Sequence, residues 1–491
     1  MRVPGNALLI LSCLYPICLA LHSLSPEASP AVVGFKIKRT TSPRPKPVRD
    51  LQRRQTISVA LGNELVSYTT NVSIGTPPQA LQLRIDTGSS DLWVNTNASQ
   101  ICSLRRNPCS GSGTYDANSS STYDFTSDDF NVTYVDGTGA SGDYATDTLS
   151  IGGKSLRGLQ FGIGYHSVSD SGVLGIGYTA NEAQVNHNGK ASYPNVPQAM
   201  VNANLIRSNA YSLWLDDLQS STGSILFGGI DTDKFTGSLQ SLPVQKVVNE
   251  YAEFLISISS VGLVQNGGTQ NLTTDLPTAA LLDSGSTLTY LPNDLTDAIY
   301  SALNVRYSQR EGSAYCTCSL AQQDISLDLK FTSPTVSIPI SELVINPNVD
   351  ITEQRVSHSK RQQYENGESD CIFGISPSGS DSAVLGDTFL RSAYVVYDLA
   401  NNRISLAPTN FNSTSSDIQE IGTESDSVPG ASVVSNVIEA AVSQTGGARV
   451  ATGTSTSHAS TSSGVGNPSQ MSTPLLLAAF LGGMLFYLFK G

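Results

Sequence analysis

This chain of 491 residues has few histidines and lacks cysteine pairs at the spacing of metal ligands. It has five histidines, and none of them lies in an HExxH motif or in a recognisable pattern of nucleophile and base. Among its seven cysteines, Cys316 and Cys318 are separated by one residue, and no second pair follows at the spacing of a zinc knuckle. These absences argue against a zinc protease, a histidine-assisted nucleophile and a structural metal site. We predict neither a metal nor a cofactor.

Phosphate-binding signatures and an excess of positive charge are missing as well. The glycine-rich stretch over residues 137–142 lacks the lysine of a P-loop. The chain has 28 basic residues against 41 acidic ones, which gives a formal net charge of −13. A nucleic acid would repel so acidic a chain, and we predict none as a partner. The acidic balance suits a protein that works at low pH or attracts basic substrates.

The N-terminal 54 residues have the composition of processing segments. Residues 1–20 contain Arg2 followed by an apolar run, which predicts a secretory signal peptide. Residues 21–54 hold eight basic residues against two acidic ones and end in Arg53-Arg54. This predicts a basic propeptide that a dibasic-processing protease removes at Arg54. The propeptide would cover an acidic cleft until acid protonates the carboxylates; the alternative is an unstructured leader.

The C-terminal residues predict a tether. After Pro408 the composition changes to serine, threonine, glycine and valine, which predicts a glycosylated or disordered stalk over residues 409–466. Residues 467–491 include an apolar run of 16 residues at positions 474–489. This is typical of a GPI-anchor signal that is removed on maturation, with Gly464 as the anchor site. A transmembrane helix is the alternative, although the run is shorter than the ~20 residues that a span needs.

One pattern occurs twice: an apolar run that ends in aspartate, a hydroxyl residue and glycine. The copies are residues 83–90 (LRIDTGSS) and residues 280–287 (ALLDSGST). The apolar runs predict buried strands, and the glycine allows the sharp turn that places each carboxylate at a strand end. The hydroxyl of Thr87 or Ser284 and the glycine N–H groups can hydrogen-bond the carboxylates and fix their orientation.

Two such turns facing each other would form one active site. Because like charges repel, only one of the carboxyl groups of Asp86 and Asp283 ionises easily, and the pair shares a proton. One aspartate then acts as general base toward a water, and the other as general acid toward the substrate carbonyl, which hydrolyses peptide bonds at acidic pH. A single such tripeptide usually only closes a loop, but two copies after apolar runs favour catalysis.

The sequence around both motifs resembles the pepsin-like aspartic proteases, and in particular the yapsins and candidapepsins of fungi. Residues 72–79 (VSIGTPPQ) and 91–94 (DLWV) flank the first aspartate. Residues 134–139 (YVDGTG) are similar to the family's flap hairpin, with Val135 in place of the usual glycine. Residues 173–175 (VLG) and 384–387 (VLGD) are similar to the segments behind the active-site loops. The resemblance extends from about Val59 to Pro408.

The resemblance implies a role for each site residue. Asp86 and Asp283 would be the catalytic pair. Their loops would be supported by Thr87, Gly88, Ser284 and Gly285.

The resemblance also implies a flap. Tyr134 would close over the substrate with its hydroxyl bonded to Trp93, whereas without the motif both residues would fit an ordinary aromatic core. Asp136 would contact the substrate backbone or a basic side chain. Asp387 would lie near Asp283 and tune the pH range, or would only belong to a turn.

The globular part predicts an all-β fold. Alternating apolar and polar stretches, such as residues 144–151 and 224–227, recur between turn residues. About 350 residues exceed one core, and each half holds one aspartate motif. We therefore expect the bilobal pepsin-like aspartic protease fold, with the active-site cleft between an N-terminal β lobe (residues 55–243) and a C-terminal β lobe (residues 244–408). Residues 293–304 predict a helix with Asn293 as its N-cap.

Two of the seven cysteines lie in the predicted signal peptide. The five that remain, together with six Asn-x-Ser/Thr sequons, fit an oxidising secretory compartment. The resemblance implies the disulfides Cys102–Cys109 and Cys318–Cys371, with Cys316 as the alternative partner of Cys371. The predicted glycosylation sites are Asn97, Asn118, Asn131, Asn271 and Asn412. The sixth sequon, at Asn71, lies in a predicted strand, as does that at Asn131.

The sequence thus predicts a secreted, monomeric aspartic endopeptidase that is anchored by lipid to the outer face of the plasma membrane or to the cell wall. Its substrates would be peptides and proteins with basic residues near the scissile bond. One alternative is a catalytically silent, wall-anchored glycoprotein that only binds peptides. Loss of a catalytic aspartate or glycine would have indicated this alternative, and none is lost. A structural mannoprotein is harder to reconcile with the protease-like residues.

Overall fold

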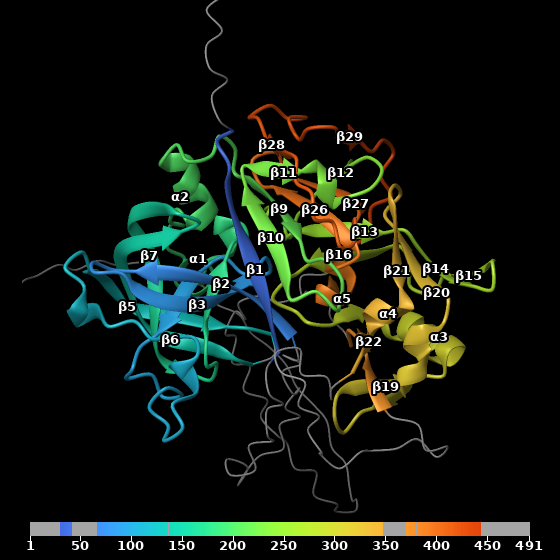
Figure 1. Cartoon of the computed structure of the whole chain (residues 1–491), viewed down its shortest axis with the longest axis horizontal. Helices are drawn as coiled ribbons and strands as arrows, with labels where there is room; N and C mark the ends of the chain where they lie inside the picture. The colour runs from blue at the N-terminus through green and yellow to red at the C-terminus, as the bar shows by residue number, and fades with distance from the viewer. Residues whose placement is uncertain (1–29, 42–65, 136, 347–369, 380–381, 443–491) are drawn as a thin grey trace, which may run out of the picture. The chain divides into compact units, whose positions relative to one another are not determined.

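The computed structural model describes residues 30–41, 66–135, 137–346, 370–379 and 382–442, and most of its regular structure is β (Figure 1). The chain divides into two compact units, Met1–Thr452 and Gly453–Gly491, and all described residues belong to the first. The predicted signal peptide, Arg54, Gly464 and the predicted anchor signal lie outside the described residues. Within the described ranges, no helix is both long and apolar enough to cross a membrane.

The largest sheet has 14 strands in the order β29-β12-β27-β26-β9-β10-β1-β2-β3-β8-β4-β7-β6-β5. These strands are β1 (Val33–Thr41), β2 (Val66–Ile74), β3 (Gln79–Asp86), β4 (Leu92–Asn95), β5 (Asp124–Thr133), β6 (Gly139–Ile151), β7 (Lys154–Ser167), β8 (Gly172–Gly175), β9 (Ala210–Trp214), β10 (Thr222–Phe227), β12 (Gln240–Pro243), β26 (Ala393–Asp398), β27 (Arg403–Pro408) and β29 (Ser432–Val433).

The remaining strands form four smaller sheets. A five-stranded sheet contains β13 (Leu255–Ile258), β16 (Thr278–Leu282), β25 (Ala383–Leu385), β17 (Thr289–Leu291) and β24 (Ile375–Pro377). One four-stranded sheet contains β15 (Gly268–Leu272), β14 (Ser260–Gln265), β20 (Ile325–Lys330) and β21 (Thr335–Pro339). A second contains β18 (Arg306–Ser308), β19 (Ser313–Thr317), β23 (Asp370–Phe373) and β22 (Val344–Ile345). The last sheet pairs β11 (Gly229–Asp231) with β28 (Ile418–Glu420).

Helices are short and few among the described residues. They are α1 (Ala183–Asn188), α2 (Val196–Asn202), α3 (Asn293–Leu303), α4 (Ile340–Leu343) and α5 (Asp387–Leu390). Single 3-10 turns occur at Pro108–Ser110, Ala117–Ser119, Thr179–Asn181, Thr232–Lys234 and Cys318–Gln322. The prediction of a mostly β fold is confirmed.

Alternation of apolar and polar residues explains the strand that leads to the first aspartate. In β3, Leu81, Leu83 and Ile85 are buried, and the side chains between them are half-buried. Burying each of these apolar side chains stabilises the fold by about 1.5–3 kcal/mol. The core therefore holds the end of β3, and with it Asp86, in a fixed place.

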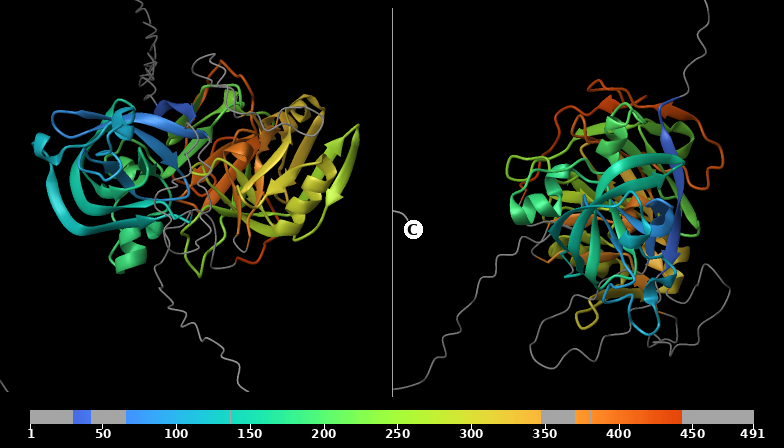
Figure 2. Two further views of the ribbon diagram at one scale, coloured as in Figure 1. Left: turned by 90° about the horizontal axis from the view of Figure 1, so that it is seen from below. Right: turned by 90° about the vertical axis from the view of Figure 1, so that its left-hand side faces the viewer.

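Strands from both halves of the chain share the largest sheet. β9 pairs antiparallel with β26, and β12 pairs antiparallel with β27. Figures 1 and 2 show β5 and β6 on one side of these shared strands, and the yellow strands β14 and β15 on the other. The lobe boundary expected at residue 243 coincides with the end of β12, and the C-terminal strands β26 and β27 return to pair with strands that precede it.

The predicted propeptide contains an ordered strand. β1 lies between β10 and β2, and it pairs antiparallel with both. Val33 and Ile37 are buried, whereas Lys36 and Lys38 are exposed. This differs from the alternative of an unstructured leader, since the alternating pattern of β1 is that of a strand with one face buried.

The start of the predicted stalk also differs from expectation. Residues 409–442 are described, and within them β28 pairs with β11 and β29 pairs in parallel with β12. The ammonium of Lys234 donates to the carbonyls of Ser413 (2.7 Å) and Ser415 (2.8 Å). It also lies 4.4 Å from the centroid of the Trp214 ring. Hydrogen bonds to main-chain carbonyls hold this segment in place. Because such bonds do not depend on apolar side chains, the polar composition of the segment did not reveal that it is ordered.

The predicted helix at residues 293–304 is α3, which spans Asn293–Leu303 and ends at Asn304 in the left-handed conformation (φ 53°). The N-cap prediction was wrong, because the capping position is Pro292. The Asn293 side chain instead accepts a hydrogen bond from the N–H of Gly379 (3.0 Å). Leu295 and Ile299 are buried, so an apolar face rather than a cap anchors this helix.

Two disulfides join Cys102 to Cys109 and Cys318 to Cys371. Cys316 is a buried free thiol, although it lies directly opposite Cys371 in the ladder between β19 and β23. Burial raises the pKa of the Cys316 thiol to about 12, so the reactive thiolate is rare at neutral or acidic pH.

Candidate active site

The two aspartate motifs occupy equivalent positions in their sheets. β3 ends at Asp86 and pairs in parallel with β8, and β16 ends one residue before Asp283 and pairs in parallel with β25. The apolar-apolar-Gly segments noted in the sequence are therefore the neighbours of the two aspartate strands. Each half of the chain presents its aspartate in the same local frame.

Each aspartate accepts two hydrogen bonds from its own loop. The N–H of the glycine two residues later lies 2.8 Å from Oδ1 in both loops, and the hydroxyl of the serine three residues later donates to Oδ2. The residues are Asp86 with Gly88 and Ser89, and Asp283 with Gly285 and Ser286. The motif alone did not indicate a role for the two serines, although both follow the glycine of their motif directly.

The hydroxyl residues of the two motifs bind the loops to each other. Thr87 Oγ1 accepts from the N–H of Ser284 (2.9 Å) and donates to the carbonyl of Leu282 (2.9 Å). Ser284 Oγ accepts from the N–H of Thr87 (3.2 Å) and donates to the carbonyl of Ile85 (3.1 Å). The four bonds are reciprocal and buried. They fix one aspartate loop against the other, as the resemblance implied for Thr87 and Ser284.

The two carboxyl groups converge at Gly285. A Cβ atom at this position would lie 2.5 Å from Oδ1 of Asp86 and 3.0 Å from Oδ1 of Asp283. Only glycine fits there, because a side chain would collide with both carboxyl groups. Asp86 is 5% exposed and Asp283 is fully buried.

Burial and a neighbouring like charge set the protonation of this pair. Burial raises the pKa of Asp283, and the adjacent Asp86 carboxyl raises it further. The hydrogen bonds from Ser286 and Gly285 lower that pKa but do not outweigh the other two effects. Asp283 is therefore the member of the pair that holds the shared proton.

A third carboxyl group lies behind the pair. The N–H of Asp387 donates to the carbonyl of Ser286 (2.8 Å), and the side chain is fully buried. Burial raises the pKa of Asp387 well above its usual range, Arg391 lowers it, and Asp283 raises it. Neither Asp387 carboxyl oxygen has a hydrogen-bond partner among the described residues. Asp387 is thus next to the Asp283 loop, where the charge of Asp283 favours the protonated form of Asp387.

The flap hairpin joins β5 to β6. Its turn is closed by hydrogen bonds between Tyr134 and Thr138 (2.8 Å) and between Gly137 and Tyr134 (2.9 Å), and Gly137 has a φ of 79°, which favours glycine. The hydroxyl of Tyr134 accepts from the indole N–H of Trp93 (2.9 Å), the contact that the resemblance implied. Asp136 lies outside the described residues.

The sequon asparagines all have exposed side chains. Asn71, Asn131 and Asn271 lie in strands β2, β5 and β15, and the others lie outside strands. The exposed side chains are Asn71, Asn97, Asn118, Asn131, Asn271 and Asn412.

Comparisons with known proteins agree with this geometry. Residues 67–409 match the model of the eukaryotic aspartyl protease family. The chain is 52% identical over 426 residues to the protein named probable aspartic-type endopeptidase opsB of Aspergillus oryzae. The aligned residues cover 86% of this chain and 85% of that protein. It is 36% identical over 370 residues to candidapepsin-3 of Candida albicans, which covers 74% of this chain and 84% of that protein.

A solved structure supports the fold. The crystal structure of aspartic proteinase from Irpex lacteus aligns with a TM-score of 0.57 at 22% identity, covering 78% of this chain and all (100%) of that chain. At this identity the likeness concerns the fold alone. The family match, by contrast, spans both aspartate loops and the strands that carry them. The chain belongs to the eukaryotic aspartyl proteases, and it is an aspartic-type endopeptidase.

Proposed function

We propose that Asp86 and Asp283 are the catalytic pair and that they hydrolyse peptide bonds at acidic pH by activating one water. The observation that carries the proposal is the convergence of the two buried carboxyl groups at Gly285. Asp86 takes a proton from the water as its oxygen attacks the carbonyl carbon, and Asp283 gives its proton to the carbonyl oxygen. The tetrahedral intermediate then collapses: the C–N bond breaks, Asp86 passes its proton to the leaving nitrogen, and one hydroxyl of the intermediate returns a proton to Asp283 as the carbonyl re-forms. No covalent bond to the enzyme forms.

Cleavage of a peptide library by protein freed of residues 1–54 tests this proposal. We expect cleavage at acidic pH that pepstatin blocks, and that declines as the pH rises through the raised pKa of Asp283 and the shared proton is lost. Folded protein that cleaves nothing at any pH would support the alternative of a catalytically silent peptide-binding glycoprotein.

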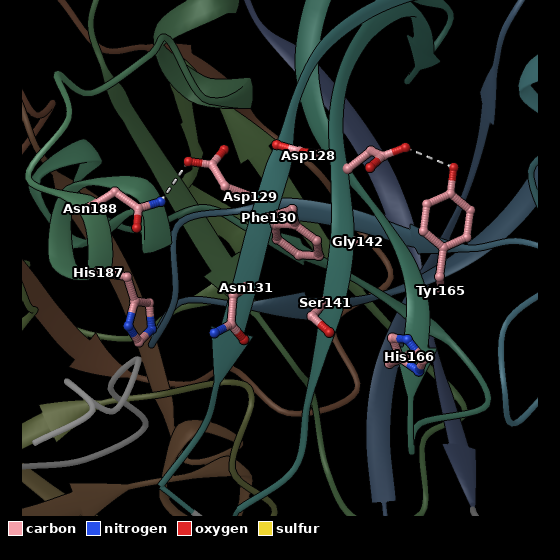
Figure 3. A pocket seen from close by; sticks show the side chains of 11 residues that line it. Asp128, Asp129, Phe130, Asn131, Ser141, Gly142, Tyr165, His166, His187 and Asn188 are labelled. Atoms are coloured by element: carbon pink, nitrogen blue, oxygen red, sulfur yellow. Dashed lines mark hydrogen bonds between the residues drawn. The ribbon is translucent and has the colours of Figure 1, made fainter. Parts of the chain in front are cut away.

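We propose in addition that the enzyme favours basic residues near the scissile bond. A pocket of about 550 Å³ lies on the flap hairpin between β5, β6, β7 and α1 (Figure 3). Asp128, Asp129 and Asp143 line it. Asp129 forms an ion pair with Lys190. Among the described residues, the side chain of Asp143 accepts a hydrogen bond only from the neutral hydroxyl of Tyr165 (2.9 Å).

Two histidines, His166 and His187, also line this pocket. Burial lowers the pKa of His187, so this side chain stays neutral to a lower pH than an exposed histidine. Asp128 and Asp143 add two carboxyl groups to the pocket that no lysine or arginine pairs with among the described residues. A lysine or arginine of a bound peptide would gain electrostatic stabilisation there.

Replacing Asp143 with asparagine should weaken the preference for basic residues. We expect kcat/KM to fall about fivefold for peptides with lysine or arginine near the scissile bond, and to stay constant for neutral peptides. Asp324→Asn is the matched control, because it removes one exposed carboxylate outside the pocket. An equal loss for neutral and basic peptides would contradict the proposed preference.

The proposal also includes the location: a secreted protein, trimmed at Arg54, glycosylated, and held at the cell surface by a GPI anchor at Gly464. Its support is the composition of residues 1–54 and 443–491. Phosphatidylinositol-specific phospholipase C should release the enzyme from intact cells, and a chain that ends at residue 466 should be secreted into the medium. Enzyme that stays membrane-bound after phospholipase treatment would favour a transmembrane helix.

A further inference from the structure

A second buried carboxylate follows the first catalytic loop. Asp91 lies five residues after Asp86 and is 1% exposed. Its Oδ1 accepts from the hydroxyls of Tyr193 (2.8 Å) and Tyr144 (3.1 Å), and its Oδ2 accepts from the N–H of Ala183 (2.8 Å). Three donors from three separate parts of the chain therefore converge on one side chain.

One of these donors belongs to the flap. Tyr144 lies on β6, the strand that leaves the flap turn, and Tyr134 lies at the start of that turn. Trp93, two residues after Asp91, donates to Tyr134. The short segment that follows the catalytic loop thus holds the hairpin at two points, once through Trp93 and once through Asp91.

A small apolar cluster surrounds these two points. Its members are Trp93, Phe130, Val132, Ala140, Tyr144, Val173, Ala183 and Tyr193, with Tyr134 packed against it. The Tyr144 ring packs edge-to-face against Phe130 (5.1 Å, 73°) and against Tyr193 (6.0 Å, 69°). The cluster is separate from the main core, so the flap hairpin has its own core with Asp91 as a polar anchor.

We propose that Asp91 is a positioning residue that sets the place of the flap relative to Asp86 by holding the hydroxyls of Tyr144 and Tyr193. The inference rests on the proposed function, in which the flap covers a bound peptide. Asp91 is joined to Asp86 by a loop that is itself bonded to the second aspartate loop. A hairpin tied to Asp91 is therefore aligned with the catalytic pair before substrate arrives, which lowers the ordering cost of binding.

Tyr144→Phe removes the hydroxyl that ties β6 to Asp91 and leaves the ring in place. We expect kcat/KM to fall about tenfold, mainly through a higher KM, and pepstatin to bind about tenfold more weakly, because both ligands lie under the flap. Tyr193→Phe removes the other hydroxyl and should act in the same direction, so it tests the inference if the first variant does not fold.

Tyr115→Phe is the matched control. The Tyr115 hydroxyl donates to the buried carboxylate of Asp147 (2.7 Å), which lies further along β6, and it makes no hydrogen bond to Asp91. It should lower the melting temperature to a similar extent and leave KM and pepstatin affinity unchanged. If Tyr144→Phe changes KM no more than Tyr115→Phe does, the inference is overturned while cleavage by wild-type enzyme still supports the proposed function. Absence of wild-type cleavage would overturn the proposed function itself.

Discussion

Asp86→Asn is expected to abolish peptide cleavage in a protein that remains folded. The amide has nearly the same size, and its oxygen can still accept the hydrogen bond that the N–H of Gly88 donates to Oδ1. Its NH2 group takes the place of Oδ2, where the rotatable hydroxyl of Ser89 can turn to accept instead of donate. It cannot take a proton from water, so the general base is lost. General acid–base catalysis contributes about 10²–10⁴-fold to a rate, and we expect a loss at the upper end of this range.

Asp283→Asn should be equally inactive for the complementary reason. Asp283 holds the shared proton, and the amide of an asparagine there is not acidic enough to transfer a proton to the substrate carbonyl. The assay is the peptide-library cleavage described above, with a thermal unfolding curve for each variant. Asp324→Asn, at an exposed position, controls for the loss of one negative charge. Residual activity above about a tenth of wild type in either variant would contradict the catalytic role of that aspartate.

The meeting of the two aspartate loops could be predicted because the sequence pattern behind it is local. Each aspartate follows an apolar strand and precedes a glycine, and the two copies are alike. The reciprocal bonds of Thr87 and Ser284 follow from that likeness, since equivalent residues in two similar loops meet across an approximate twofold relation. A repeated short pattern thus indicates a symmetric contact.

The support of the flap could not be predicted, because it joins distant residues without a shared pattern. Tyr144 and Tyr193 lie 53 and 102 residues from Asp91. Asp91 belongs to the DLWV motif, which indicated Trp93 as a partner of Tyr134 but gave no partner for the aspartate. Buried tyrosine hydroxyls seek acceptors, yet the sequence does not tell which acceptor the fold supplies.

Composition alone misjudged two terminal segments. Residues 409–442 have few aromatic residues, yet hydrogen bonds such as those from Lys234 to two carbonyls hold them in place. β1 was interpreted by its positive charge, although Val33 and Ile37 alternate with lysines as expected for a strand with one buried face. The pairing of β26 with β9, which joins strands from both halves of the chain, is likewise a property of topology and not of local sequence.

Glu182→Gln is expected to make the stability of the protein less sensitive to rising pH. Glu182 is fully buried, its Oε2 accepts from the N–H of Tyr193 (2.8 Å), and its Oε1 has no hydrogen-bond partner among the described residues. Burial raises the pKa of Glu182 from 4.5 to about 9, the Tyr193 N–H lowers it, and the charge of Asp91 raises it. The folded protein therefore keeps a proton that the unfolded chain loses above pH 4.5.

The sign of the effect follows from this difference in bound protons. The stabilisation is fully present below the unfolded pKa of 4.5 and is lost as pH rises toward about 9. Within that window the free energy of unfolding should fall by up to about 1.4 kcal/mol per pH unit because of this group. Glutamine does not titrate, and its amide oxygen can still accept from Tyr193, so the variant should lack this slope.

Urea unfolding of wild type and Glu182→Gln at several pH values between about 4 and 7 measures the slope. Glu250→Gln is the matched control, since Glu250 is exposed and the same chemical change there should leave the slope unaltered. Identical slopes for wild type and Glu182→Gln would mean that Glu182 is ionised in the folded protein. If the pH dependence of the free energy of unfolding disappears in Glu182→Gln and not in Glu250→Gln, the protonated Glu182 carboxyl stabilises the fold beside Tyr193 at acidic pH. The same low pH that keeps Asp283 protonated would then also keep the flap core in its most stable state.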